Sequence, residues 1–136
     1  RAHIEGKRVI LVDDSIVRGT TSMKIVEMVR NAGAKEVHMR IAAPPTTDPC
    51  FYGIDTPDKD KLLASRYDVA GMAKFIGVDS LAFVSIDGLY RAMGLPGRDG
   101  ANPAFCDACF TGDYPIALDD VVGVEDRQLS LLVESA

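Results

Sequence analysis

An unbroken apolar run near the start of the chain, Val9 to Val12, follows two basic residues and precedes two aspartates. A short run of this kind is typical of a strand that is buried on both faces of a parallel sheet. After a polar stretch, apolar residues recur at helical spacing as far as Gly33, a residue type that often follows the last turn of a helix. Residues 36–42 then alternate between apolar and polar side chains, which predicts a second strand. These segments predict a strand, a helix and a parallel strand.

The middle of the chain begins with a loop. Prolines break regular structure over residues 43–57, and Asp55 is interpreted there as a turn residue. Asp68 then stands in the position of a helix cap, and Gly77 in the position that ends the same helix. The apolar spacing between these two residues predicts a helix that packs on the sheet.

A second strand and helix pair follows in the sequence. Residues 81–84 are apolar and predict a strand, and Ser85 can cap the helix that comes next. The apolar face of that helix consists of Ile86, Leu89, Tyr90 and Met93. Residues 105–115 have no regular pattern, whereas residues 116–136 are expected to form a short strand and an amphipathic helix. The alternation of strands and helices predicts an α/β fold with a parallel sheet and flanking helices.

The composition agrees with one globular domain, because 47% of the 136 residues are hydrophobic and 26% are charged. No apolar run approaches the roughly 20 residues of a membrane-spanning helix, and the first residues lack the apolar stretch of a signal peptide. The formal net charge of −5 argues against binding to nucleic acid. We therefore expect a cytoplasmic protein with neither a membrane nor a nucleic-acid partner.

The loop between the first strand and the first helix carries the most informative chemistry. A helix N-terminus offers free backbone N–H groups and the positive end of the helix dipole, which together favour an anion. Gly19 lets the backbone approach a phosphate closely. The side-chain donors are Arg18, Thr20, Thr21 and Ser22. Asp13 and Asp14 suit ribose hydroxyls and Mg²⁺ instead, so the loop predicts a ligand with sugar, phosphate and metal parts. The alternative is a solvated strand end followed by a capping hydroxyl.

Three cysteines, Cys50, Cys106 and Cys109, are too few and odd in number for a disulfide framework. Two of them form a C-x-x-C motif. One interpretation is a metal or iron–sulfur site that lacks one ligand in this chain. The other is a set of unrelated thiols, and spacing alone leaves both open.

The run from Val12 to Ser22 resembles the phosphoribosyl pyrophosphate (PRPP) motif of type I phosphoribosyltransferases, in the form found in the glutamine PRPP amidotransferase family. Further segments resemble the same family in the same order. These segments are residues 49–55, 79–83, 85–89 and 105–115. The resemblance therefore extends over nearly the whole chain.

The resemblance implies a flavodoxin-like phosphoribosyltransferase core. In it, Asp13 and Asp14 hold the ribose hydroxyls and Mg²⁺, while Ser15, Arg18, Gly19, Thr20 and Thr21 cradle the 5′-phosphate. The reaction of the family displaces pyrophosphate from PRPP with glutamine-derived ammonia and gives 5-phosphoribosylamine, the first step of purine synthesis. Some members carry a 4Fe–4S cluster, and Cys50, Cys106 and Cys109 match three of its four ligands.

The family's other parts have no counterpart in this sequence. We expect the glutaminase domain, the first part of the phosphoribosyltransferase domain and the fourth cluster cysteine to lie upstream of Arg1. Residues 1–136 are then one partial domain that is inactive alone, with no catalytic residue assigned, from a homo-oligomeric parent enzyme. Two alternatives are a non-catalytic module that senses PRPP and a small zinc protein. The zinc protein would use the three cysteines together with His38 or His3.

Overall fold

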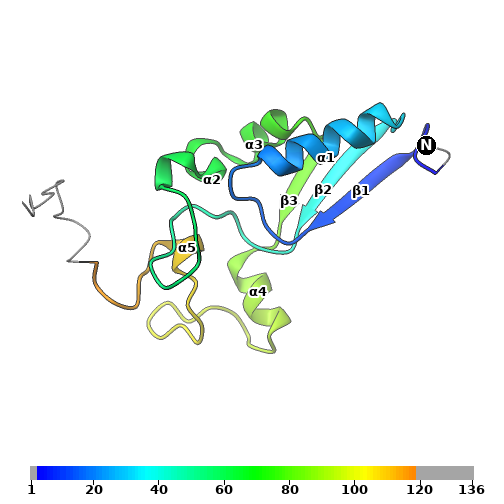
Figure 1. Cartoon of the computed structure of the whole chain (residues 1–136). Coiled ribbons are helices and arrows are strands. Elements are labelled where there is room, and N and C mark those ends of the chain that lie inside the picture. Colours follow the sequence, from blue (N-terminus) through cyan, green and yellow to red (C-terminus); the bar gives the residue numbers. More distant parts are fainter. Residues whose placement is uncertain (1–2, 119–136) are drawn as a thin grey trace, which may run out of the picture.

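The computed structural model describes residues 3–118, which form a three-stranded parallel sheet and its helices (Figure 1). The strands are β1 (Arg8–Asp13), β2 (Glu36–Ile41) and β3 (Ser80–Phe83), arranged in the order β1-β2-β3. The helices are α1 (Thr20–Asn31), the 3-10 helix η1 (Lys59–Lys61), α2 (Leu63–Arg66), α3 (Val69–Ile76), α4 (Ile86–Ala92) and α5 (Ala108–Thr111). The predicted strand, helix and parallel strand at the start of the chain are confirmed, as is the α/β class.

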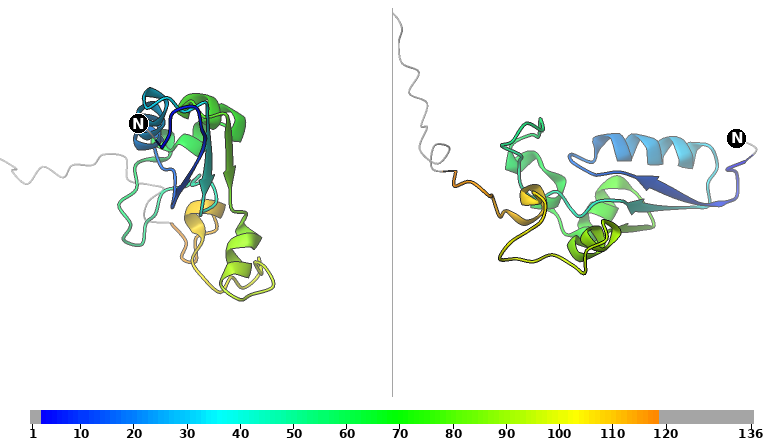
Figure 2. Two further views of the ribbon diagram at one scale, coloured as in Figure 1. Left: turned by 90° about the vertical axis from the view of Figure 1, so that its right-hand side faces the viewer. Right: turned by 90° about the horizontal axis from the view of Figure 1, so that it is seen from below.

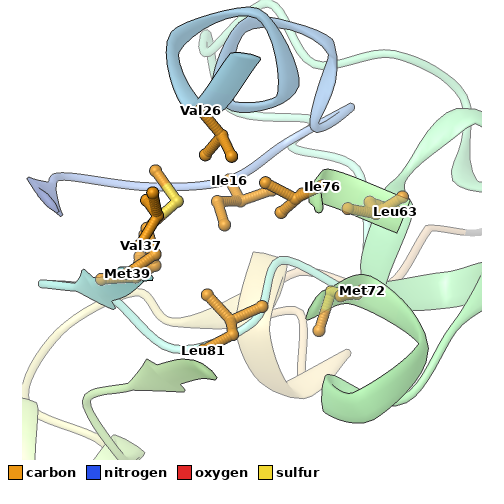
Figure 3. Packing of buried hydrophobic residues seen from close by; sticks show 9 residues of the cluster. Ile16, Val26, Val37, Met39, Leu63, Met72, Ile76 and Leu81 are labelled. Carbon is orange, nitrogen blue, oxygen red and sulfur yellow. The ribbon is translucent and has the colours of Figure 1, made fainter. Parts of the chain in front are cut away.

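One face of the sheet carries the hydrophobic core. Strand β2 alternates as predicted, with Val37, Met39 and Ile41 buried on the side that α1 and α3 cover. Val26 of α1 and Ile76 of α3 point toward these strand residues (Figure 3). Because burial of apolar surface is the main favourable contribution to folding, this interface holds the strands and both helices together.

The prediction that the first strand is buried on both faces is wrong. Ile10 is 64% exposed and Val12 is 75% exposed, because β1 lies at the edge of the three-stranded sheet and no described helix covers this face. The opposite face of β1 is only partly buried. An apolar run indicates that its side chains favour burial, but it does not indicate which segment covers them.

The predicted helix ends are largely confirmed. The Asp68 side chain accepts a hydrogen bond from the Gly71 N–H at 2.7 Å, and Gly77 follows α3 with a φ of 87°. The Ser85 hydroxyl accepts from the Gly88 N–H at 3.0 Å. Met93 departs from the prediction: it lies just past α4 and is 62% exposed, so it is not part of the packed face.

Short helices in the second half were not predicted. Helix α5 forms one turn inside residues 105–115, which were expected to be irregular, and η1 and α2 follow the proline-rich loop. One-turn helices lack the apolar spacing that identifies longer ones. The expected strand and helix at residues 116–136 lie almost wholly outside the described residues. No helix within residues 3–118 is long and apolar enough to cross a membrane.

The chain beyond β3 lies past the carboxyl ends of the strands. Figures 1 and 2 show α4, α5 and the loop between them at this end of the sheet, while α1 and α3 lie along the sheet itself. In open parallel sheets, ligands bind outside the carboxyl ends of the strands. The fold therefore brings the predicted phosphate loop and the cysteine-bearing segments to the same end of the molecule.

Candidate functional site

A cavity of about 530 Å³ opens at the carboxyl end of β1, where the chain turns into α1. All of the residues predicted to bind the sugar phosphate line it. They are Asp13, Asp14, Ser15, Arg18, Gly19, Thr20 and Thr21. Asp55 and Pro57, from the proline-rich loop after β2, also line the cavity. The structure thus brings the predicted residues together in one concave site, the usual form of a small-molecule site.

The N-terminus of α1 faces this cavity without a side-chain cap. Gly19 occupies the cap position in the left-handed region, and the first turn contains no acidic residue. The first helical bond runs from the Met23 N–H to the Gly19 carbonyl at 2.9 Å. The N–H groups of Thr20, Thr21 and Ser22 precede that bond, so they are available to an anion. The helix dipole adds to the attraction, because its positive end lies here.

Two anchors hold the loop in this shape. Ile16 is buried in the hydrophobic core, and the Val17 carbonyl accepts a hydrogen bond from the Leu63 N–H of α2 at 2.8 Å. Within the loop, Gly19 packs against α2, and a Cβ at this position would lie 2.7 Å from Leu63 Cδ2. The close packing explains why a residue without a side chain stands at Gly19.

The two aspartates are oriented by the backbone that follows them. Asp13 Oδ1 accepts a hydrogen bond from the Asp14 N–H at 3.0 Å, and Asp14 Oδ1 accepts from the Ser15 N–H at 2.7 Å. The second oxygen of each carboxylate has no hydrogen-bond partner within the described residues. Mg²⁺ in proteins is commonly held by one or two carboxylates together with substrate phosphates and water. Asp13 and Asp14 have the donor chemistry for that kind of site, in which the substrate supplies the remaining oxygens.

The hydroxyl donors differ from the prediction at one position. Thr20 and Thr21 are exposed at the cavity, but Ser22 is only 4% exposed, because it lies on the inner side of α1. Ser22 still lines the cavity, but as a nearly buried residue of α1. Arg18 is exposed and also lines an adjoining cavity together with Asp60, Lys61 and Arg66. Lys61 is paired with Asp58 at 2.5 Å, so the positive charge beside the loop comes mainly from the two arginines.

Asp55 is the site residue that the sequence interpretation missed. The sequence pattern predicts a turn residue at this position, but the structure places Asp55 in the lining of the cavity with the phosphate loop. The available signal was its position inside residues 49–55, one of the segments that resemble the amidotransferase family. A single aspartate in a proline-rich stretch carries no such signal by itself, because turns favour aspartate for local reasons.

The three cysteines gather in a second region. All are free thiols; Cys106 is exposed, whereas Cys50 and Cys109 are half-buried. Burial raises the pKa of the Cys109 thiol, and the nearby charges of Cys50 and Cys106 raise it further. Backbone hydrogen bonds from the Thr47 and Asp48 N–H groups to the Cys109 carbonyl, at 3.0 and 3.1 Å, place the Cys50 segment beside α5. Even so, the described residues contain no group of three or more His, Cys, Asp or Glu side chains arranged to hold a metal ion.

The histidine of the zinc alternative is engaged elsewhere. His38 Nδ1 lies 2.8 Å from Ser80 Oγ, and Nε2 lies 3.0 Å from Glu36 Oε2 on the open face of the sheet. Both ring nitrogens thus have partners, as in a structural histidine. Over residues 3–118, neither His38 nor His3 forms a metal site with the cysteines.

Comparison with known proteins relates the chain to one group of enzymes. It is 63% identical over 137 residues to an amidophosphoribosyltransferase of Rhizobium etli, covering 99% of this chain and 28% of that protein. It is 53% identical to the Bacillus subtilis amidophosphoribosyltransferase, covering 85% of this chain and 24% of the relative. The chain thus spans about a quarter of the length of these relatives. No protein-family profile matches it.

Solved structures give the same relationship. A glutamine PRPP amidotransferase from B. subtilis, in complex with ADP and GMP, superposes with a TM-score of 0.75 at 53% identity, covering 84% of this chain and 25% of that one. A structure described as the allosteric regulatory enzyme of purine biosynthesis gives a TM-score of 0.73 at 51% identity, covering 85% of this chain and 25% of that one. These similarities confirm the family resemblance and the phosphoribosyltransferase-type sheet.

Proposed function

Because this chain is homologous to amidophosphoribosyltransferases over about a quarter of their length, we propose that it is the part of such an enzyme that binds PRPP. The observation that carries the proposal is the cavity at the N-terminus of α1, where uncapped N–H groups and two oriented carboxylates lie side by side. The N–H groups suit a phosphate, and the carboxylates suit a ribose with Mg²⁺. The Mg²⁺ complex of PRPP contains all of these groups.

In this proposal the 5′-phosphate lies against the start of α1. The backbone N–H groups of Thr20 and Thr21, their hydroxyls and the Arg18 guanidinium supply charge-assisted and neutral hydrogen bonds. Gly19 lets the loop pack closely against α2, since any side chain there would collide with Leu63. The phosphate thereby anchors one end of the substrate to a rigid loop.

Asp13 and Asp14 act on the other end of the ribose. Their partnerless oxygens can accept hydrogen bonds from ribose hydroxyls and can ligate Mg²⁺. Mg²⁺ would supply positive charge that stabilises the departing pyrophosphate. The reaction breaks the bond between C1 of the ribose and pyrophosphate and forms a bond between C1 and ammonia, which then loses a proton. The chain's contribution is to hold the ribose so that C1 stays in one position during this exchange.

The cysteine region fits an iron–sulfur cluster in its donor chemistry. Thiolates are the usual ligands of such clusters, and Cys50, Cys106 and Cys109 share one region of the described structure. We propose these three residues as ligands of a 4Fe–4S cluster whose fourth ligand is not among them. A cluster would join the loop of Cys50 to the segment of Cys106 and Cys109, and so add to the aromatic contact between Phe51 and Tyr114.

Three properties of the longer protein remain predictions: a glutaminase domain that supplies ammonia from glutamine, a homo-oligomeric assembly and a cytoplasmic location. Each concerns a part or a state of the protein that residues 3–118 do not contain. The relatives are consistent with the first, since a solved one is a glutamine PRPP amidotransferase.

The proposed function can be tested by transplanting this chain. The matching 137-residue segment of the R. etli enzyme, at 63% identity, is replaced with the present sequence. We expect the chimera to release pyrophosphate from PRPP with ammonium and Mg²⁺ at a rate within about tenfold of the R. etli enzyme. The unmodified R. etli enzyme is the positive control, and a chimera with Arg18→Ala and Thr20→Val is the matched negative control.

Calorimetry separates the possible outcomes. A chimera that binds PRPP without turnover would support the PRPP-sensing alternative. A folded chimera that binds no PRPP, beside an active R. etli enzyme, would show that the phosphate-loop assignment is wrong.

A further inference from the structure

A buried carboxylate lies between the two cysteines of the C-x-x-C segment. The Asp107 residue is only 3% exposed, and its Oδ2 accepts hydrogen bonds from Arg98 Nε at 2.6 Å and from the Tyr90 hydroxyl at 2.9 Å. Its Oδ1 accepts from Arg98 Nη2 and from Thr111 Oγ1, both at 3.2 Å. Burying a charge is costly unless it is paired and hydrogen-bonded, and Asp107 meets that condition in full.

The donors come from different parts of the chain. Tyr90 belongs to α4, Arg98 to the loop after α4, and Thr111 to α5. The Asp107 backbone carbonyl also accepts from the Phe110 and Thr111 N–H groups, at 2.9 and 3.1 Å. One residue therefore connects α4, the following loop and the turn of α5.

This region has almost no apolar core of its own. The buried members of the hydrophobic core cluster all lie between Ile16 and Leu81. Beyond residue 83, the buried apolar residues of the described structure are Tyr90 and Ala108. Phe105 packs beside Tyr90 with ring centroids 5.8 Å apart, and the buried polar bonds of Asp107 give direction to this contact between the C-x-x-C segment and α4.

The turn of α5 in turn determines the position of Cys50. The Cys109 carbonyl accepts hydrogen bonds from the Thr47 and Asp48 N–H groups, at 3.0 and 3.1 Å. The Tyr114 hydroxyl donates to the Pro49 carbonyl at 2.6 Å. The segment that ends at Cys50 is thus bound to the backbone of α5 and to a side chain shortly after α5, so a shift of α5 is transmitted to Cys50.

We propose that Asp107 is the positioning residue of the cysteine site. Its ion pair with Arg98 and its hydrogen bond from Tyr90 fix the turn that carries Cys106 and Cys109. The hydrogen bonds to the Cys109 carbonyl then hold the Cys50 segment against this turn. Asp107 itself would not bind the metal. The inference rests on the cysteine metal site proposed above.

The test compares two aspartate variants of the full chain. Asp107→Asn removes the charge that pairs with Arg98 and keeps the shape of the side chain. Asp79→Asn is the control, because Asp79 also pairs with an arginine and a backbone N–H, at Arg30 Nη2 (2.9 Å) and Val37 (2.7 Å), but it lies directly before β3, outside the cysteine-bearing segments. Thermal unfolding measures the stability of each variant. Titration with Co²⁺ reports thiolate coordination through the intensity of thiolate-to-cobalt absorption.

We expect Asp107→Asn to weaken Co²⁺ binding at least tenfold and to lose most of the thiolate absorption. Asp79→Asn should keep Co²⁺ affinity within about twofold. Its loss of stability should be smaller, because the Asp79 side chain is 40% exposed and the Asp107 side chain only 4%. If Asp107→Asn does not fold, Arg98→Lys replaces it, since lysine keeps the charge but lacks the two-pronged geometry. An Asp107→Asn or Arg98→Lys chain that keeps the wild-type cobalt spectrum and affinity would overturn the inference.

A second measurement tests the positioning role of Asp107 in the absence of metal. Mass spectrometry follows alkylation of each cysteine by iodoacetamide in the metal-free chain, where Cys109 is half-buried and Cys106 is exposed. We expect Asp107→Asn to speed Cys109 alkylation at least fivefold, with no such change in Asp79→Asn. If the wild-type chain shows no thiolate absorption with Co²⁺, a single ion does not join the three cysteines, in agreement with their arrangement in the described residues, and the alkylation ratio alone then supports or overturns the positioning role.

Discussion

Leu63 closes the phosphate loop against Gly19: a Cβ on Gly19 would lie 2.7 Å from Leu63 Cδ2, inside the distance that carbon atoms tolerate. The Leu63 N–H also donates to the Val17 carbonyl at 2.8 Å, so the start of α2 contacts the loop twice. Leu63 is fully buried and cannot move aside easily. The shape of the loop is therefore set by a helix more than forty residues further along the chain.

Gly19→Ala is the first prediction. Gly19 has a φ of 77°, where an L side chain is strained, and the added methyl group would also collide with Leu63 and approach Phe75 at 3.3 Å. We expect a loss of about 2–4 kcal/mol in the free energy of unfolding. Displacement of the loop should also weaken PRPP binding at least tenfold. Urea unfolding and calorimetry with Mg²⁺ and PRPP measure the two effects.

Gly6→Ala is the matched control for that prediction. Gly6 has a similar φ of 70°, but a Cβ there meets no atom within 4 Å. It should cost only the backbone strain, about 1 kcal/mol, and leave PRPP binding unchanged. Equal losses in the two variants would contradict the claim that contact with Leu63 shapes the loop.

The sequence predicts much of this fold because its signals there are local. The cap at Asp68, the glycine after α3 and the alternation of Val37, Met39 and Ile41 depend on the residue itself and its neighbours. The phosphate loop is also local, since its donors follow one another along the chain. Its predicted residues accordingly line one cavity.

The features that the sequence could not predict depend on distant contacts. The exposure of Val12 depends on which segment covers the sheet, and the role of Asp55 depends on how a proline-rich loop folds back toward β1. The buried pair of Asp107 and Arg98 joins residues nine positions apart through an irregular loop, for which no periodic pattern exists. Such contacts are decided by tertiary packing and leave no regular trace in the sequence.

A pair of valine variants tests the one-sided core. Val26 is 2% exposed within the core, whereas Val12 is 75% exposed on the open face of the sheet. Val26→Ala should lower the free energy of unfolding by roughly 2 kcal/mol, because it removes two buried methyl groups and leaves a cavity. Val12→Ala should change it by less than about 0.5 kcal/mol. A larger loss at Val12 in urea unfolding would mean that something covers this face in solution.

Asp79 should make stability depend on pH. The Val37 N–H and then the Arg30 guanidinium lower the pKa of Asp79 below its usual range. Its stabilising contribution is therefore present above the usual pKa of an aspartate, about 3.9, and is lost as the pH falls through the lowered value. In urea unfolding, Asp79→Asn should be less stable than the wild-type chain at pH 7, and the gap should narrow below about pH 4.

Asp13→Asn tests the division of the cavity into a phosphate part and a ribose–metal part. In the chimera with the R. etli enzyme, it removes one of the two charges proposed to hold Mg²⁺ and the ribose, but leaves the N-terminus of α1 intact. We expect affinity for PRPP with Mg²⁺ to fall at least tenfold, because a charged hydrogen bond or metal contact is worth about 1.5–3 kcal/mol. Affinity for inorganic phosphate, which needs only the loop, should stay within about threefold.

Glu27→Gln, an exposed carboxylate on α1, controls for the change in net charge. Unchanged PRPP affinity in Asp13→Asn would remove Asp13 from the site, and a parallel loss of phosphate affinity would show that the variant disturbs the loop itself.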